Sequence, residues 1–340
     1  MKRILVVLIS VVVSLLVACD SDSGSNSTAD QYRVALITSQ GGLGDRSFND
    51  SGYEGLKRAE EELGIEIRVV EPGDISEGER YLTDLAGNDF DLIITLEYGH
   101  ADVLNRVAPN YPDVLFSIFN IEVDQPNVIS VIYEEQEASF LAGVLAALVT
   151  IDNSISQTND EKVISAIGGV DSPGINKFIV GFEEGAHYID ENIQVLSGYV
   201  NSFNDPARAK EMALTQISSG SDAVFQIAGG SGIGVFEAAE ERGVFAIGVD
   251  SDQDYLAEGT ILTSVLKRVD VGVFTLSEML KDGDLLGGNI MRFGLKEDGV
   301  GLSPMEYTRH LLPDEYLETL DQVKEGIISG EITVTDVSRE

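Results

Sequence analysis

Short apolar runs alternate with longer amphipathic stretches along most of the chain, starting near residue 33. Runs of four to eight apolar residues are typical of buried strands, and apolar residues that recur every three to four positions predict helices. The predicted strands cover residues 34–38, 65–70, 92–96, 114–119, 128–133, 162–167, 193–199, 223–227 and 244–249. The predicted helices cover 48–63, 76–85, 101–108, 134–148, 175–187, 205–218 and 234–242. This repeated strand–helix–strand order indicates an α/β fold, with parallel sheets that carry helices on both faces.

The alternation of predicted strands and helices divides into two similar halves. A polar stretch at 152–161 separates them, and 340 residues suit about two domains. The sequence Ser-Phe-Asn-Asp at 47–50 recurs at 202–205, each time at the start of a predicted helix. In open α/β sheets, ligands bind beyond the carboxyl ends of strands, where helices begin. We therefore expect Phe48 and Phe203 to face a cleft between two lobes, although either ring taken alone also suits a core position.

Both repeats carry signals for a helix start. Asp205 followed by Pro206 predicts an N-cap with proline at the first helical position. Ser47 and Asp50 have the spacing of a capping box, with aspartate in the place usually taken by glutamate.

The first thirty residues are predicted to be an export signal followed by a flexible tether. Lys2 and Arg3 precede an apolar run at 4–17, which is shorter than the ~20 residues of a membrane span and is typical of a signal peptide. The run ends Leu-Val-Ala-Cys, which resembles a bacterial lipobox and implies cleavage before Cys19 and lipidation of its thiol; a plain signal peptide is the alternative. Residues 20–30 hold no large apolar side chain and predict a flexible tether. The mature protein is expected on the extracytoplasmic face of the cell membrane.

Charge and composition exclude several classes of function. Asp and Glu number 58 against 22 Lys and Arg, so the formal net charge is −36. Such a chain does not suit nucleic acid, which requires a basic face. Cys19 is the only cysteine, and the three histidines form no metal-binding motif. No nucleophile triad is evident, so the sequence predicts neither an enzyme nor a metal or other cofactor.

The polar residues of the second half point to a sugar-bearing ligand. Asp250 follows an apolar strand, where a carboxylate accepts hydrogen bonds from adjacent hydroxyls, and Lys267 supplies a donor. Asp250 and Asp252 are too close in sequence for the ~5–9 Å separation of a glycosidase pair. The glycine-rich stretch 228–234 lacks the dinucleotide-binding spacing, so Gly230 either offers backbone N–H groups to a ligand or belongs to a tight turn. A flat ring between Phe48 and Phe203 would gain ~1–3 kcal/mol per stacked phenyl group.

Six segments together resemble the basic membrane protein family, bacterial substrate-binding lipoproteins of ABC transporters typified by the purine nucleoside receptors. These segments are GGLGDRSFN at 41–49, EEQEASFLAG at 134–143, SFNDPA at 202–207, AGGSG at 228–232, GVDSDQ at 248–253 and LKRVD at 266–270. The resemblance implies a two-lobed periplasmic-binding-protein fold of the ribose-binding type, with three crossovers between the lobes. The ligand contacts that it implies are Phe48 and Phe203 on the base, Asp250 and Lys267 near the ribose, Asn49, and the backbone of Gly230.

Two positions depart from the family pattern. Nucleoside-binding members usually carry aspartate just after the first strand and at the end of the strand predicted at 114–119; this chain has Ser39 and Asn120 there. An ionised carboxylate only accepts hydrogen bonds, whereas an asparagine amide also donates them. The contacts to the base edge are therefore expected to differ, and a sugar or a flavin-like molecule stays an alternative ligand.

The expected organisation follows from these observations. It comprises a signal peptide at 1–18, a tether at 19–30, a first lobe at 31–145 with a returning segment near 265–285, a second lobe at 146–264, and residues 286–340 packed on the lobes. Hinge bending is expected near 120–150 and 250–270. The implied partners are a nucleoside, an ABC permease with its ATPase, and the membrane through the lipid anchor, with the protein itself a monomer. A signalling or adhesion lipoprotein is the alternative, and the export signal disfavours a transcription regulator.

Overall fold

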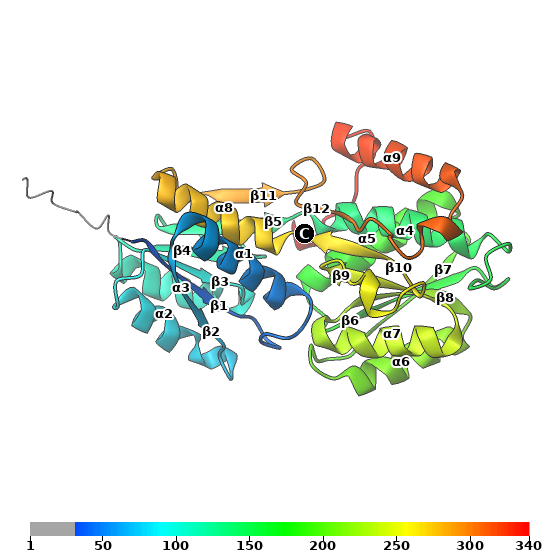
Figure 1. The fold of residues 1–340 in the computed structure, drawn as a ribbon, viewed down its shortest axis with the longest axis horizontal. Coiled ribbons are helices and arrows are strands. Elements are labelled where there is room, and N and C mark those ends of the chain that lie inside the picture. Colours follow the sequence, from blue (N-terminus) through cyan, green and yellow to red (C-terminus); the bar gives the residue numbers. More distant parts are fainter. Residues whose placement is uncertain (1–30, 340) are drawn as a thin grey trace, which may run out of the picture. The chain divides into compact units, whose positions relative to one another are not determined.

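Two parallel-dominated sheets organise the part of the chain that the computed structural model describes, residues 31–339. The signal peptide, the tether and Cys19 lie outside the described residues. The first sheet has the order β11-β5-β4-β3-β1-β2 and the second the order β12-β10-β9-β8-β6-β7 (Figure 1). We call the sheets with their covering helices the first and second lobes. The predicted α/β architecture is confirmed.

The strands of the first sheet are β1 (Arg33–Ile37), β2 (Glu66–Val70), β3 (Leu92–Thr95), β4 (Leu115–Phe119), β5 (Val128–Tyr133) and β11 (Ile290–Phe293). Those of the second are β6 (Val163–Gly168), β7 (Gln194–Tyr199), β8 (Ser221–Ile227), β9 (Phe245–Asp250), β10 (Ile261–Lys267) and β12 (Val300–Leu302). All pairings are parallel except that of β12 with β10. The nine strands predicted from the sequence are all present, with ends that shift by a residue or two.

Helices cover both faces of each sheet. The first lobe carries α1 (Phe48–Leu63), α2 (Gly78–Ala86), α3 (Ala101–Val107) and α8 (Val269–Asp282), and the second carries α4 (Glu135–Thr150), α5 (Pro173–Ile189), α6 (Pro206–Ser218), α7 (Ile233–Arg242) and α9 (Asp314–Ser329). Neighbouring residues of a central strand face opposite sides, as the strand period of two requires. Ile94 belongs to the same apolar cluster as Leu56 of α1, whereas Ile93 belongs to the cluster that contains Leu82 of α2. Continuous apolar strands therefore lie between two helical layers.

The chain crosses between the sheets three times within residues 31–339. The crossings run from β5 into α4, from β10 into α8 and from β11 to β12. The first falls at Glu134, and α4 packs along α5 of the second lobe. The division expected from the sequence instead extended the first lobe to residue 145, so it included most of α4. The apolar surface of a helix does not show which of two sheets the helix will cover. After the second crossing, α8 returns to pack against α1.

The N-terminus of α1 is capped by a residue other than those predicted. The Asp45 carboxylate accepts hydrogen bonds from the backbone N–H groups of Ser47 and Asn49, both at 2.9 Å, and of Asp50 at 3.1 Å. Ser47 makes no side-chain cap bond, so the predicted capping box is wrong. The Ser47 hydroxyl instead donates to Asp250 of the second lobe. The cap predicted at Asp205 is confirmed, since its carboxylate accepts from the N–H of Arg208 at 3.1 Å.

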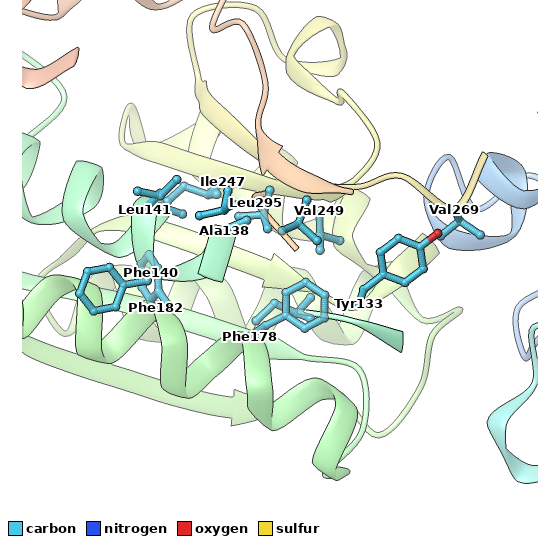
Figure 2. Packing of buried hydrophobic residues seen from close by; sticks show 14 of the residues in the cluster. Tyr133, Ala138, Phe140, Leu141, Phe178, Phe182, Ile247, Val249, Val269 and Leu295 are labelled. Atoms are coloured by element: carbon cyan, nitrogen blue, oxygen red, sulfur yellow. The ribbon is translucent and has the colours of Figure 1, made fainter. Parts of the chain in front are cut away.

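The helices α4 and α5 pack with their backbones close together. Nearly all residues of α4 are buried, and Figure 2 shows Phe140 of α4 and Phe182 of α5 within one apolar cluster. A Cβ atom added at Gly143 would lie 2.0 Å from the carbonyl oxygen of Phe182, and one at Gly185 would lie 2.0 Å from that of Phe140. Glycine is required at these positions because any side chain would meet backbone atoms.

We therefore expect Gly143→Ala to lower the free energy of unfolding by about 1–3 kcal/mol, because the helices must separate to admit the methyl group. Denaturant unfolding followed by circular dichroism measures the change. Gly174→Ala in α5 is the matched control, since its added Cβ meets no atom within 4 Å. The control is expected to retain or slightly raise the stability, as alanine favours helices over glycine. Equal stability of Gly143→Ala and the wild type would contradict this packing argument.

Candidate functional site

A cavity of about 640 Å³ lies between the lobes and is lined by residues of both. Its volume is within the range of small-molecule sites in proteins, about 300–1,000 Å³. The structure places in its lining all eight residues singled out from the sequence: Ser39, Phe48, Asn49, Asn120, Phe203, Gly230, Asp250 and Lys267. The eight residues therefore share one cavity, and their roles in ligand binding stay predictions.

Several polar residues of the cavity lie at the ends of strands. Asn120 follows β4 directly, Asp250 ends β9 and Lys267 ends β10. The backbones of Asn120 and Asp250 have φ values of 70° and 65°. Asparagine and aspartate tolerate this left-handed conformation better than most residues. The turn at each strand end therefore suits the residue type found there.

The two phenyl groups enter the cavity from different lobes. Phe48 is the first residue of α1, whereas Phe203 precedes α6. Both are half-buried cavity-lining residues. The Phe203 ring rests against Gly169, where an added Cβ would lie 2.3 Å from the ring. The first lobe approaches Phe203 through Gly41, where an added Cβ would be 3.8 Å from the Phe203 Cβ.

A buried cluster of ions holds Lys267 in place. Its ammonium lies 2.6 Å from one oxygen of Glu135, whose other oxygen is 2.7 Å from Lys177. Lys177 also donates to the carbonyl oxygen of Tyr133 at 2.6 Å. Tyr133 ends β5, and its hydroxyl donates to the carbonyl oxygen of Arg268 at 2.9 Å; Figure 2 shows the ring pointing toward the start of α8. The cluster thus joins two of the crossings between the lobes.

Burial and pairing oppose each other at Glu135. Burial alone would raise the pKa of this carboxyl, but the two ammonium groups outweigh that effect and lower the pKa to about 2. Burial likewise tends to lower the pKa of Lys177, and the Glu135 carboxylate reverses this, so the pKa of Lys177 is raised. Both shifts favour the charged forms of the pair. Glu135 and Lys177 therefore stay ionised at neutral pH.

Asp250 is a buried carboxylate at the interface between the lobes. Burial raises its pKa to about 6, although Lys267 and the hydrogen bond from Ser47 act in the opposite direction. A second hydrogen bond nearby joins the lobes, from the Gln253 side-chain amide to the carbonyl oxygen of Arg46 at 2.8 Å. Asp250 is thus held close to a contact that spans the cleft.

The segment after β1 is fixed by side-chain bonds. The Ser39 N–H donates to the Asn49 side-chain oxygen at 2.8 Å, and the Ser39 hydroxyl donates to Glu97 at 3.0 Å. The Asn49 amide donates to Asp45 at 3.0 Å. Asn49 therefore binds this segment and the α1 cap as well as lining the cavity.

The arginines at the rim of the cavity are already paired. Arg292 of β11 contacts Glu122 and, at 3.4 Å, Glu134. Arg339, near the end of the described chain, contacts Glu134 at 2.6 Å and Asp336 at 2.8 Å. The positive charge at the rim is therefore balanced by carboxylates.

Sequence reasoning did not assign roles to several residues of the site. Asp45 and Glu135 lie within the segments that carry the family resemblance, so their motifs contained the signal. Glu97 and Lys177 lie outside those segments, and only the folded chain brings them to the site. Their partners are distant in sequence, which local patterns do not show.

Neither metal binding nor membrane spanning is indicated by the described residues. No group of three or more His, Cys, Asp or Glu side chains in this part of the chain is arranged to hold a metal ion. No helix within it has both the length and the apolar character needed to cross a membrane.

The two lobes, the crossings between them and the shared cavity define a substrate-binding protein with a periplasmic-binding-protein fold. The chain belongs to the family described as ABC transporter substrate-binding protein PnrA-like, whose model matches residues 32–338. It is 34% identical to basic membrane protein D of Borreliella burgdorferi over 94% of this chain and 92% of that protein. It is 31% identical to the ABC transporter nucleoside-binding protein BmpA of Lactococcus lactis over 95% of each. A solute-binding protein of an ABC transporter system from Aeropyrum pernix has a similar crystal structure, with a TM-score of 0.82, 30% identity and coverage of 90% of this chain and 93% of that one.

Proposed function

We propose that this protein is an extracytoplasmic lipoprotein that captures a nucleoside in the cavity between its lobes and delivers it to an ABC importer. The observation that carries the proposal is the pair Phe48 and Phe203, which line one cavity from different lobes. A flat heterocycle between them would contact both lobes, so stacking on both rings would favour the closed state. Asp250 and Lys267 lie at strand ends on the same cavity, where ribose hydroxyls would find an acceptor and a donor.

The pairing of the cations favours a neutral nucleoside over a nucleotide. Phosphate is bound best by arginine or lysine groups that are free to contact its oxygens. Here Lys177 and Lys267 share Glu135, and the rim arginines contact Glu122, Glu134 and Asp336. A phosphate group would therefore have to displace existing carboxylate partners.

Calorimetric titration with purine nucleosides, the matching monophosphates, free ribose and riboflavin tests the proposed ligand. We expect the nucleosides to bind most tightly. Tighter binding of a monophosphate would contradict the argument from paired cations. Equal binding of ribose would favour the sugar receptor, and preferred binding of riboflavin the flavin-like ligand. Mass spectrometry of small molecules that co-purify with the protein gives an independent identification.

The lipid anchor and the importer are proposed on separate grounds. The lipobox-like sequence before Cys19 supports the anchor, and the family supports a permease and an ATPase as partners. Metabolic labelling with a radioactive fatty acid should mark the wild type but not Cys19→Ser. Equal labelling of both would contradict lipidation at this residue. Nucleoside uptake that is unchanged by deletion of the gene would favour a signalling or adhesion role.

The raised pKa of Asp250 predicts that nucleoside affinity depends on pH. The ionised carboxylate accepts hydrogen bonds from ribose hydroxyls, and its protonated form loses part of that capacity. As pH falls through about 6, the pKa of the ligand-free carboxyl, the affinity should therefore decrease, by up to about tenfold per pH unit below it. Titrations at pH 5 and 7.5 measure this, and calorimetry at pH 6 in buffers of different ionisation enthalpy detects the released proton.

Asp250→Asn is the control, because an amide does not titrate in this range. It is expected to bind more weakly at pH 7.5 and to lose the pH dependence. A wild-type affinity that is constant across this range, or the same profile in Asp250→Asn, would rule out titration of Asp250 as the cause.

A further inference from the structure

The Asn120 side chain is fixed with one end against a lysine. The residue follows β4, and its backbone N–H donates to the carbonyl oxygen of Val131 at 2.8 Å. Its side-chain oxygen lies 2.7 Å from the ammonium nitrogen of Lys267. Lys267 is in turn paired with Glu135 at 2.6 Å and is almost fully buried. Both partners of the hydrogen bond are therefore held in position.

This contact decides which way the amide faces. An ammonium group only donates hydrogen bonds, so the asparagine oxygen, and not its nitrogen, must lie against Lys267. No other residue in the described chain accepts a hydrogen bond from the Asn120 amide nitrogen. Asn120 is half-buried and lines the cavity. The oxygen is thus turned to Lys267, and the end left for a ligand is the NH₂ group with its two donors.

The orientation distinguishes between purine bases. A free asparagine pairs with adenine by using its oxygen and its nitrogen together, on the 6-amino group and on N7. Here the oxygen is held toward Lys267, so oxygen and nitrogen are not free to pair together with adenine. The O6 and N7 atoms of guanine and hypoxanthine are two adjacent acceptors, which suit an NH₂ group, whereas the amino group of adenine would place a donor against a donor.

We propose that Asn120, oriented by Lys267, selects a 6-oxopurine nucleoside over a 6-aminopurine nucleoside. The inference rests on the proposed function, because it assumes a nucleoside whose base lies against this wall of the cavity. Ser39, on the same lobe, offers an acceptor where Asn120 offers a donor. Its hydroxyl hydrogen is directed to Glu97 at 3.0 Å, so its oxygen presents lone pairs and can accept from the N1–H of an oxopurine.

Calorimetric titration of the wild type and Asn120→Asp with inosine and adenosine tests the assignment. The wild type is expected to bind inosine about tenfold more tightly, since the amino group of adenosine leaves the Asn120 donor without an acceptor in the closed cavity. In Asn120→Asp the order should reverse, because a carboxylate accepts from the amino group of adenosine and repels O6. Asn153→Asp makes the same change at an exposed position and should keep the wild-type order.

A third ligand tests the proposal without any variant. Purine riboside has neither the 6-oxygen nor the N1–H of inosine, so it loses the contacts proposed for Asn120 and Ser39. We expect it to bind the wild type at least about tenfold more weakly than inosine. Equal affinities of the three nucleosides, a wild-type preference for adenosine, or an unchanged order in a folded Asn120→Asp protein would each overturn the role of Asn120 while leaving nucleoside binding intact. Absence of binding of all three would instead overturn the proposed function, and this inference with it.

Discussion

Replacement of Phe203 by alanine is expected to weaken nucleoside binding by roughly tenfold to a hundredfold. Base–aromatic stacking contributes ~1–3 kcal/mol, and each 1.4 kcal/mol corresponds to a factor of ten in affinity. The loss should be close to the full stacking term, because alanine keeps none of the aromatic face that Phe203 contributes to the cavity lining. Calorimetric titration of the purified variant with the preferred nucleoside measures the effect.

Two further variants make the interpretation specific. Phe203→Tyr keeps an aromatic face and should bind nearly as the wild type does. Tyr255→Ala removes an exposed aromatic group that is not among the cavity-lining residues, and its affinity should not change. If Phe203→Ala folds and binds with wild-type affinity, the ring does not contact the ligand and the stacking model fails. A similar loss in Phe48→Ala is expected if both rings enclose the base.

The strands up to β9 and their parallel pairing were predictable because each depends on patterns short in sequence, whereas β10, β11 and β12 were not predicted. Apolar runs of four to eight residues gave the central strands, and the repeated Ser-Phe-Asn-Asp placed Phe48 and Phe203 at equivalent helix starts. Asn120 directly follows a strand of the first sheet, and Asp250 ends a strand of the second. Each sheet presents the carboxyl ends of its parallel strands at one edge, and both residues line the cavity there.

The contacts that orient these residues were not predictable, because they join segments far apart in the chain. Ser47 has the local spacing of a cap, yet its hydroxyl donates to Asp250, about two hundred residues later. Lys177 and Glu135 lie on different helices, and they meet only because α4 and α5 pack together. The sequence around either residue does not show this pairing. The lobe that α4 joins is likewise set by the crossing at Glu134, which apolar periodicity does not show. Local pattern and the family resemblance thus indicated residues that share one cavity, and only the fold shows their hydrogen bonds.

Glu135→Gln is expected to lower the free energy of unfolding by about 3 kcal/mol or more at neutral pH. The carboxylate is the shared partner of Lys177 and Lys267, all three being at least nine-tenths buried, and removal of one partner of a buried ion pair typically costs about 3–5 kcal/mol. The lowered pKa of Glu135 agrees in direction, because it means that the folded protein favours the charged carboxylate. Denaturant unfolding at pH 7 measures the loss.

The lowered pKa of Glu135 also determines how the free energy of unfolding changes at acid pH. The Glu135 pKa is lower in the folded protein than in the unfolded chain, so the unfolded chain binds more protons between the two values. The contribution of the pair is therefore complete above about pH 4.5 and is lost as pH falls toward 2. Glu135→Gln should unfold at lower denaturant concentration at pH 7 and should lose less further stability than the wild type over this acid window.

Two further variants distinguish uncompensated buried charge from lost packing as the cause of the lower stability of Glu135→Gln. Glu211→Gln makes the same change on the exposed face of α6 and should alter the stability by no more than about 0.5 kcal/mol. Adding Lys177→Met to Glu135→Gln removes one of the two stranded cations and should recover part of the lost stability. If the double variant is less stable than Glu135→Gln alone, the cost arises from packing rather than from uncompensated charge. If Glu135→Gln matches the wild type at pH 7, the buried cluster does not stabilise the crossings between the lobes, and Lys267 must be positioned for Asn120 by other contacts.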